Sequence, residues 1–143
     1  MAEVYVEGLD RLLRKLDEIA RVEAVQEGLK NACYIVWASA QDKCPVDDGT
    51  LRRSITRSIE YDKGIVGTNT EYASYVEYGT GLFSEFRSGR KDVPWQYEDA
   101  EGNKRITRGQ RPQPYLRPAL VENKDKIVEC ICRSIKNKAR EVF

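Results

Sequence analysis

The chain has 143 residues, with 24 lysines and arginines against 23 aspartates and glutamates, so its formal net charge is +1, and it contains no histidine. The absence of histidine excludes a Ser-His-Asp triad, a Cys-His dyad and any metal site with histidine ligands. The near-zero charge removes a global electrostatic argument for nucleic-acid binding. The length predicts one domain, residues 1–143, whose core needs no disulfide or metal. The apolar runs are far shorter than the roughly 20 residues of a membrane span, and residues 1–5 lack a secretory signal, so we expect a protein made and kept in a cytosol.

Apolar spacing predicts a long helical segment at the start of the chain. A short β-like run at residues 4–6 comes first, and Pro45 predicts that the helix ends near Lys43. We expect Trp37 to be a core residue and no large apolar face on the solvent side of the helices. Two apolar series, separated by polar residues 21–23, recur at three- and four-residue steps: Leu9, Leu12, Leu13, Leu16, Ile19 and Ala20, then Val25, Leu29, Ala32, Cys33, Val36, Trp37 and Ala40.

The period changes to that of β-structure in the middle of the chain. Residues 54–61 alternate, with Ile55, Ile59 and Tyr61 on one face, and a turn at residues 62–64 leads to a second strand at 65–68, which predicts a hairpin. Leu51 also fits a four-residue spacing, so a helical turn there is an open alternative. Residues 72–78 then predict a short helix that ends at a glycine.

Residues 82–111 are the least core-like stretch and are predicted to form an extended arm. Good turn chemistry at residues 101–104, between residues 95–97 and 105–107, predicts a β-hairpin within it. We expect the arm to become ordered on assembly, because few of its residues can bury area within one subunit. Pro118 is suited to the first turn of a final helix of about 25 residues.

The four cysteines carry no metal-binding pattern. There is no CxxC pair, and Cys130 and Cys132 are two residues apart on a predicted helix, where they point to opposite sides. We expect four reduced thiols in the cell, and no metal or cofactor: Cys33, Cys44, Cys130 and Cys132.

Adjacent carboxylates beside a glycine invite an enzymatic hypothesis. Asp47 and Asp48, with Glu77, would be the acidic residues of a small toxin or nuclease. The favoured alternative is that Asp48, just before Gly-Thr, accepts a backbone N–H at the start of the next element. Residues 79–81 resemble a phosphate loop only superficially, because a lone GxG is a weak signal.

Two basic clusters, residues 86–91 and 104–111, interleave with Trp95 and Tyr97. Such clusters can contact phosphate backbones. Their charges can equally pair with the acidic residues 98–101 or with a partner protein, and we favour a protein partner.

Three segments together resemble a known family. Residues 45–55, PVDDGTLRRSI, are similar to its P-x-D-T-G-x-L-R-x-S-I signature; residues 72–81, YASYVEYGTG, to Y-A-x-Y-V-E-[FY]-G-T-G; and residues 113–120, QPYLRPAL, to Q-P-F-L-R-P-A-L. This is the tail-completion, or head-tail joining, family of long-tailed double-stranded-DNA bacteriophages, the gene-product-ten family. The arm fits too, since many members carry a Trp- and Tyr-bearing insert ending in Thr-x-Gly-Gln, here residues 107–110. Asp48 replaces the family's usual Thr, and Tyr115 replaces Phe, which adds a hydroxyl that needs a partner if buried.

The resemblance implies a small α+β protein, an antiparallel β-sheet packed against N-terminal and C-terminal helices, here with the long hairpin arm. It also implies a virion structural protein at the head-tail neck, assembled in the bacterial cytoplasm. Such a protein forms a ring, six-fold in related tail terminators, terminates the tail, docks neck and tail-tube proteins, and catalyses no reaction. Contact with passing DNA follows from that position.

The candidate residues fall into two groups. One group is expected to supply core and inter-subunit contacts: Arg52, Tyr72, Tyr75, Glu77 and Tyr78. The other belongs to the arm and is expected to bind partners, or DNA under the alternative hypothesis of a DNA-binding module: Trp95, Tyr97, Arg105, Ile106, Arg108 and Arg111.

Overall fold

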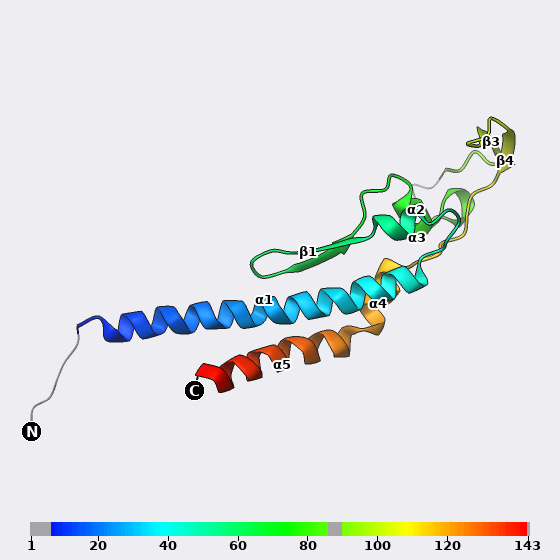
Figure 1. Ribbon diagram of the computed structural model, residues 1–143. Coiled ribbons are helices and arrows are strands. Elements are labelled where there is room, and N and C mark those ends of the chain that lie inside the picture. The colour runs from blue at the N-terminus through cyan, green and yellow to red at the C-terminus, as the bar shows by residue number, and fades with distance from the viewer. Residues whose placement is uncertain (1–6, 86–89, 143) are drawn as a thin grey trace, which may run out of the picture. The chain divides into compact units, whose positions relative to one another are not determined.

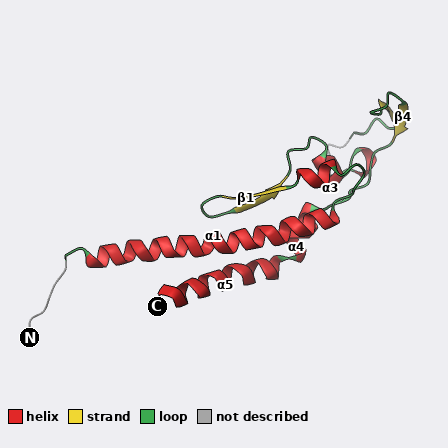
Figure 2. Ribbon diagram, viewed as in Figure 1, coloured by secondary structure: helices red, strands yellow, loops and turns green. Residues whose placement is uncertain are grey.

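A computed structural model describes residues 7–85 and 90–142. The fold is α+β, as expected, with 56% helix and 12% strand, and Figure 2 shows the strands confined to two small sheets. The predicted strand at residues 4–6 lies outside the described residues. The elements, in chain order (Figure 1), are α1 Leu9–Lys43, α2 Thr50–Ser54, β1 Thr56–Ile59, β2 Gly64–Gly67, α3 Ala73–Tyr78, the 3-10 helix η1 Gly81–Phe83, β3 Trp95–Glu98, β4 Lys104–Thr107, α4 Leu116–Glu122 and α5 Lys124–Val142.

The chain divides into two compact units. The first comprises Met1–Ile35, Arg57–Ile65 and Asn123–Phe143, and the second comprises Val36–Thr56 and Val66–Glu122. The single domain, residues 1–143, stays a prediction. No helix in the described ranges is long and apolar enough to span a membrane.

The first unit pairs α5 with the earlier part of α1 in antiparallel fashion (Figure 1). A Cβ on Gly28 would lie 2.7 Å from the Cα of Ile131, so the two helix backbones approach closely there. Lys138 Nζ on α5 lies 3.3 Å from Glu23 Oε2 on α1. This pairing buries the small residue Ala24, which is what close helix packing requires.

The turn end of the β1–β2 hairpin packs on α1 within the same unit. A Cβ on Gly64 would overlap the Sγ of Cys33, so only glycine fits at this position. The Arg57 guanidinium lies 5.0 Å from the Tyr34 ring centroid. Of the apolar face predicted for this hairpin, Ile55 is buried, Ile59 is half-buried and Tyr61 is exposed.

The core of the second unit begins on the later part of α1. Trp37 Nε1 donates a hydrogen bond to the Ile55 carbonyl at 2.9 Å, which ties α1 to the chain after α2. The predicted end of α1 at Lys43, ahead of Pro45, is confirmed, and Leu51 lies in the helical turn α2, which resolves the open alternative. The buried apolar residues are Val36, Ala40, Cys44, Leu51, Ile55, Ala73, Tyr115 and Ala119.

Two sequence expectations about helices were wrong. The predicted final helix of about 25 residues is two helices, because the chain breaks at Asn123, whose carbonyl accepts the Ile127 N–H at 2.9 Å at the start of α5. Asparagine favours such caps over helix interiors. The helices also do expose an apolar face, along the first turns of α1, where Leu12 and Leu16 are more than half exposed.

Candidate functional site

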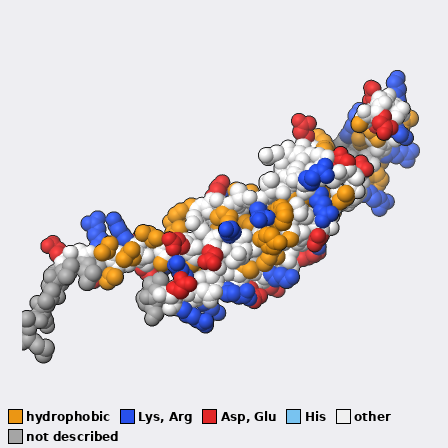
Figure 3. All heavy atoms as spheres, viewed as in Figure 1, with side chains coloured by type: hydrophobic (Ala, Val, Ile, Leu, Met, Phe, Trp, Pro, Cys, Tyr) orange, Lys and Arg blue, Asp and Glu red, His pale blue; other side chains and the backbone are white. Residues whose placement is uncertain are grey.

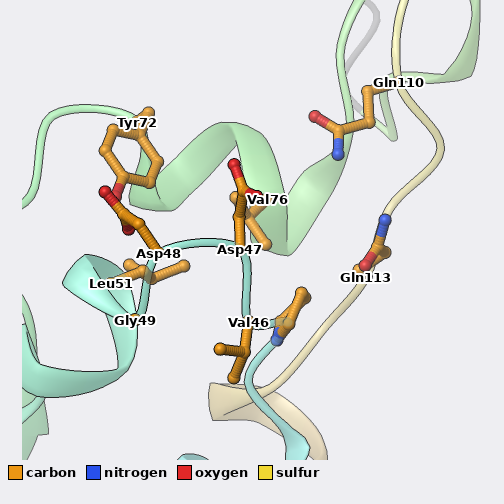
Figure 4. Close-up of a pocket in the computed structure, with 10 residues that line it drawn as sticks. Val46, Asp47, Asp48, Gly49, Leu51, Tyr72, Val76, Gln110 and Gln113 are labelled. Atoms are coloured by element: carbon orange, nitrogen blue, oxygen red, sulfur yellow. The ribbon is translucent and has the colours of Figure 1, made fainter.

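The three sequence motifs meet around one cavity in the second unit. The cavity has a volume of about 530 Å³ and is open to solvent. Figure 4 shows Asp47 and Asp48 rising from the 45–49 loop toward the helix that carries Val76, with Gln110 and Gln113 on another stretch of chain. The residues that line it are Pro45, Val46, Asp47, Asp48, Gly49, Leu51, Tyr72, Val76, Gln110 and Gln113.

The Asp48 carboxylate caps the start of α2. Its Oδ1 accepts the Thr50 N–H at 2.8 Å, so the hydrogen bond predicted at the start of the next element is confirmed, while the N-cap residue of α2 is Gly49. That hydrogen bond from Thr50 is the main reason why the pKa of Asp48 lies below its usual value, and the side chain therefore stays ionised at neutral pH. A carboxylate of this kind suits binding of a cation better than proton transfer, which needs a pKa near the working pH.

Glu77 is the most heavily bonded carboxylate in the second unit. It is 3% exposed, and it accepts the backbone N–H groups of Tyr115, Leu116 and Arg117 at 2.8, 3.0 and 3.0 Å. Burial raises the pKa of Glu77, but these three N–H donors and the Arg117 side chain outweigh it and hold the pKa below its ordinary value. Glu77 on α3 thus caps the N-terminus of α4, where helices leave N–H groups unsatisfied.

Arg117, which sequence reasoning did not single out, completes this junction. Its Nε lies 3.1 Å from Glu77 Oε1, and its Nη1 lies 2.9 Å from Glu85 Oε2. Its guanidinium also lies 4.8 Å from the Tyr78 ring centroid. Hydrogen bonds to Glu85 and Glu77 raise the pKa of Arg117 further. The signal that could have found it is its place in the third motif, two residues after Tyr115.

The base of the arm is held by a second set of contacts that the sequence did not predict. Thr80 N–H donates to the Gln110 carbonyl at 2.9 Å, Gln110 N–H donates to Thr80 Oγ1 at 2.8 Å, and Leu82 N–H donates to the Arg108 carbonyl at 3.1 Å. We call this set, between residues 79–82 and 108–110, the clamp. The N–H groups of Gly79, Thr80 and Leu82 donate to carbonyls within the chain, which argues against a phosphate loop at residues 79–81.

Glycine is required where the two sides of the clamp touch. Gly81 and Gly109 have φ of +59° and +122°, conformations that L side chains rarely adopt. A Cβ on Gly109 would overlap the Thr80 carbonyl oxygen, and a Cβ on Gly81 would overlap that of Arg108. The G-T-G element at residues 79–81 and the T-x-G-Q element at residues 107–110 therefore contact each other in the clamp.

The arm itself is the predicted antiparallel hairpin. β3 pairs with β4 in the register Gln96↔Ile106 and Tyr97↔Arg105, which places Ile106 on the opposite face from Tyr97 and Trp95. Trp95 is half-buried, packs near Gly81, and has the Arg90 guanidinium 5.0 Å from its ring centroid. Trp95 thus anchors the arm to its own subunit, whereas Tyr97 is 46% and Ile106 74% exposed.

Several basic side chains of the arm already have acidic or aromatic neighbours. Arg105 Nε lies 3.0 Å from Asp99 Oδ2, and the Arg111 guanidinium lies 5.3 Å from the Phe83 ring centroid. Arg108 is exposed. Residues 86–89 of the first basic cluster lie outside the described residues. DNA contact stays a prediction, and the pairing of Arg105 with Asp99 favours the alternative of a solvated or protein-binding arm.

The remaining candidates spread over the surface near the cavity. Tyr72 lines the cavity and, like Tyr75 and Arg52, is exposed, whereas Tyr78 is half-buried against Arg117. The structure therefore brings Tyr72 and the motif residues together, and it keeps Tyr97 and Ile106 on the arm. Inter-subunit contact by these residues stays a prediction.

The three acidic residues of the nuclease hypothesis do not share a site. Glu77 accepts hydrogen bonds from the backbone at the start of α4, and Asp48 accepts one at the start of α2. Among residues 7–85 and 90–142, no group of three His, Cys, Asp or Glu side chains is placed to hold a metal ion. All four cysteines are unpaired in the structure, with Cys33 and Cys44 buried and Cys132 exposed.

Comparison with known proteins identifies the family. No curated protein and no solved structure matches the chain. A family model described as "Bacteriophage HK97-gp10, putative tail-component" matches residues 8–79, half of the chain, which span α1 to α3 and include the first motif and most of the second. The chain therefore belongs to the HK97-gp10-like family of bacteriophage tail components.

Proposed function

We propose that this tail component acts at the neck of the virion, where it completes the tail and joins it to the head. Membership of the family gives the chain a structural role in the phage tail, and hence a place in the virion. In the proposal, copies assemble as a ring in the bacterial cytoplasm and dock neck and tail-tube proteins. No chemical reaction takes part.

The observation that carries the proposal is the contrast between the base and the tip of the arm. The base is fixed by the clamp and by Trp95, while the tip presents Tyr97 and Ile106 to solvent on its two faces. Exposed aromatic and aliphatic side chains are suited to partner binding, and the fixed base limits the ordering that the arm is expected to undergo on assembly. A joining protein needs such a projection toward a neighbour.

The cavity supports a structural role rather than catalysis. Its carboxylates include one with a pKa below its usual value, Asp48, and its other polar side chains are Asp47, Tyr72, Gln110 and Gln113. These groups offer hydrogen-bond acceptors and negative charge to a basic or polar side chain of a neighbouring protein.

The experiment shortens the arm without touching the clamp. Trp95 and Thr107 are direct cross-strand neighbours, so an Asn-Gly turn can join them in place of residues 96–106. We expect this variant to melt near the wild-type temperature, because the removed residues are almost entirely exposed. Cells infected with phage carrying it should accumulate filled heads and free tails that do not join, as seen by electron microscopy of lysates.

A matched control and a direct localisation complete the test. Gln96→Ala, a single change in the same hairpin, should leave joining intact. Normal head-tail joining with the shortened arm would remove the role given to the tip. Cryo-EM of complete wild-type particles without this chain at the neck would overturn the proposed position.

A further inference from the structure

One side of α5 carries basic residues along most of the helix. Its members recur at alternating steps of three and four residues, which places them on one face. All of them are exposed, and in Figure 3 basic side chains follow the lower edge of the molecule, where α5 lies in Figure 1. We call this set, four cations and one carboxylate, the basic ridge: Lys126, Glu129, Arg133, Lys136 and Arg140.

Most of the charge on the basic ridge is not neutralised within the described residues. Its one carboxylate, Glu129, pairs with Arg133 inside the helix. The other ion pairs of α5 are made by Lys138, which lies outside the ridge and pairs with Glu23 of α1 and with Glu141. Three ridge cations have no ion pair in the described part of the chain: Lys126, Lys136 and Arg140.

The surroundings of the ridge leave it basic and free of apolar side chains. Successive residues of a helix turn by about 100°, so the exposed Val128 and Ile135 lie about 120–140° round α5 from the centre of the ridge. Asp125 lies about 60° from that centre, so four cations stand against two carboxylates. Glu27 of α1 is exposed and forms no ion pair with the ridge among the described residues.

This composition fits the phosphates of a nucleic acid better than a protein surface. The centre of a protein interface depends on aromatic and apolar anchors and contains few charges, and the ridge has no such anchor. Contacts to a phosphate backbone can be made by lysine and arginine side chains without other residue types. A second copy of α5 is a poor occupant, because its ridge would bring like charges together.

The length of the ridge suits a DNA duplex. The helix rises about 21 Å from Lys126 to Arg140. A duplex carries one negative charge per about 1.7 Å of its axis, so a helix that lies along the backbone meets several phosphates at any register. Contacts of this kind position a protein without reading the base sequence.

We propose that the basic ridge of α5 binds the phosphate backbone of double-stranded DNA without sequence preference. Lys126, Lys136 and Arg140 each neutralise a phosphate, while Arg133 stays shared with Glu129. The sequence pattern had favoured the arm for any contact with DNA, whereas the cations named here lie on a helix of the other unit. This binding goes beyond the proposed function and does not depend on the neck position.

The test measures binding of the purified full-length chain to a fluorescently labelled duplex of about 25 base pairs. Fluorescence anisotropy is recorded between about 20 and 200 mM KCl. Three phosphate contacts predict a slope of about −3 when the logarithm of the association constant is plotted against that of the salt concentration. Lys126→Gln with Lys136→Gln should reduce the slope to about −1 and weaken binding by at least about tenfold.

A change at Glu129 should have the opposite sign. Glu129→Gln releases Arg133 for a fourth phosphate contact, so the slope should steepen to about −4 and binding should tighten about fivefold. Glu18→Gln is the matched control, because it removes the same charge from an exposed position of α1, about 120° round that helix from Ala24, which packs against α5. It should change the affinity by less than about twofold.

A second control separates the ridge from the overall charge of the chain. Arg11→Gln with Lys15→Gln removes two exposed cations of α1 that lie about 140–180° round the helix from Ala24. This pair should change the affinity by less than about twofold. Circular dichroism should report wild-type helix content for every variant, because glutamine has nearly the helix propensity of lysine, arginine and glutamate.

Four results would overturn the inference. A wild-type chain that does not bind the duplex at the lowest salt concentration would remove DNA as the ligand. Equal losses from the ridge pair and the α1 pair would leave only an effect of net charge. Loss of binding on shortening the arm, with the ridge variants binding normally, would place the contact on the arm. Tighter binding of labelled poly-glutamate than of the duplex would assign the ridge to an acidic protein instead.

Discussion

The α3–α4 junction and the tip of the arm belong to the same unit and use their side chains in opposite ways. At the junction, every oxygen of Glu77 has a donor within the chain, and Arg117 links it to Glu85. At the tip, Tyr97 and Ile106 are left to solvent on two faces of the hairpin. A carboxylate whose oxygens all accept hydrogen bonds within the chain stabilises the fold, whereas exposed apolar side chains are available to partners.

In this unit, the type of a residue does not by itself show what its side chain does. Glu77 is the kind of residue that invites a catalytic or interface role, yet its contacts make it a helix cap. Trp95, an aromatic expected to bind a partner, is half-buried against its own subunit. Four predictions concern the internal contacts of the second unit.

The largest effect is expected from Glu77→Ala. It leaves the N–H groups of Tyr115, Leu116 and Arg117 without their acceptor and the Arg117 charge without one partner, which should cost about 3–5 kcal/mol of unfolding free energy. Urea denaturation monitored by circular dichroism measures the loss. Tyr97→Ala, at the tip, should change the same quantity by less than about 0.5 kcal/mol.

Glu77 also predicts a pH dependence with a definite sign. Because its folded pKa lies below the ordinary value of 4.5, its contribution is complete above that value and is lost as the pH falls through the folded pKa. Glu77→Gln, which cannot ionise, should lack this part of the acid destabilisation. Identical acid profiles for the two proteins would show that the cap is not a charged one.

A smaller loss is expected from Gly109→Ala in the clamp. The new Cβ overlaps the Thr80 carbonyl oxygen, so the backbone of the clamp must move. Together with the strain of a positive φ at alanine, this should lower the unfolding free energy by about 2–4 kcal/mol. Gly102→Ala is the control, because Gly102 also has a positive φ, +83°, but nothing closer than Glu98 Oε1 at 3.5 Å. It should cost only about 1–2 kcal/mol, and equal losses at the two sites would mean that the clamp is not tightly packed.

The smallest effect has the opposite sign. The Tyr115 hydroxyl is buried and has no hydrogen-bond partner among the described residues, and burial raises the pKa of Tyr115 to about 12. Tyr115→Phe should therefore stabilise the fold by about 1 kcal/mol, seen as a higher melting temperature. Tyr97→Phe, which removes an exposed hydroxyl, should leave the melting temperature unchanged, and a destabilised Tyr115→Phe would indicate a partner for the buried hydroxyl.

The sequence by itself determined the elements whose causes are local. The three- and four-residue spacing along α1, its end ahead of Pro45, the turn chemistry between β3 and β4, and the Asp48 cap all depend on residues within a few positions of one another. The motifs also pointed to the family, since their order and spacing can be read from the sequence without any knowledge of contacts. Local chemistry could not fix Leu51, which fitted either period.

Only the tertiary structure decided what the distant pairs do. Glu77 meets its donors 38 to 40 residues away, and Thr80 meets Gln110 30 residues away, so neither the cap nor the clamp has a local signature. The exposure of Leu12 and Leu16 on α1 is likewise a property of the packed chain, because a sequence pattern shows which side of a helix is apolar but not which of its turns another element covers. Burial and pairing are properties of the packed chain, and they decide which of its polar and apolar side chains remain free to meet another molecule.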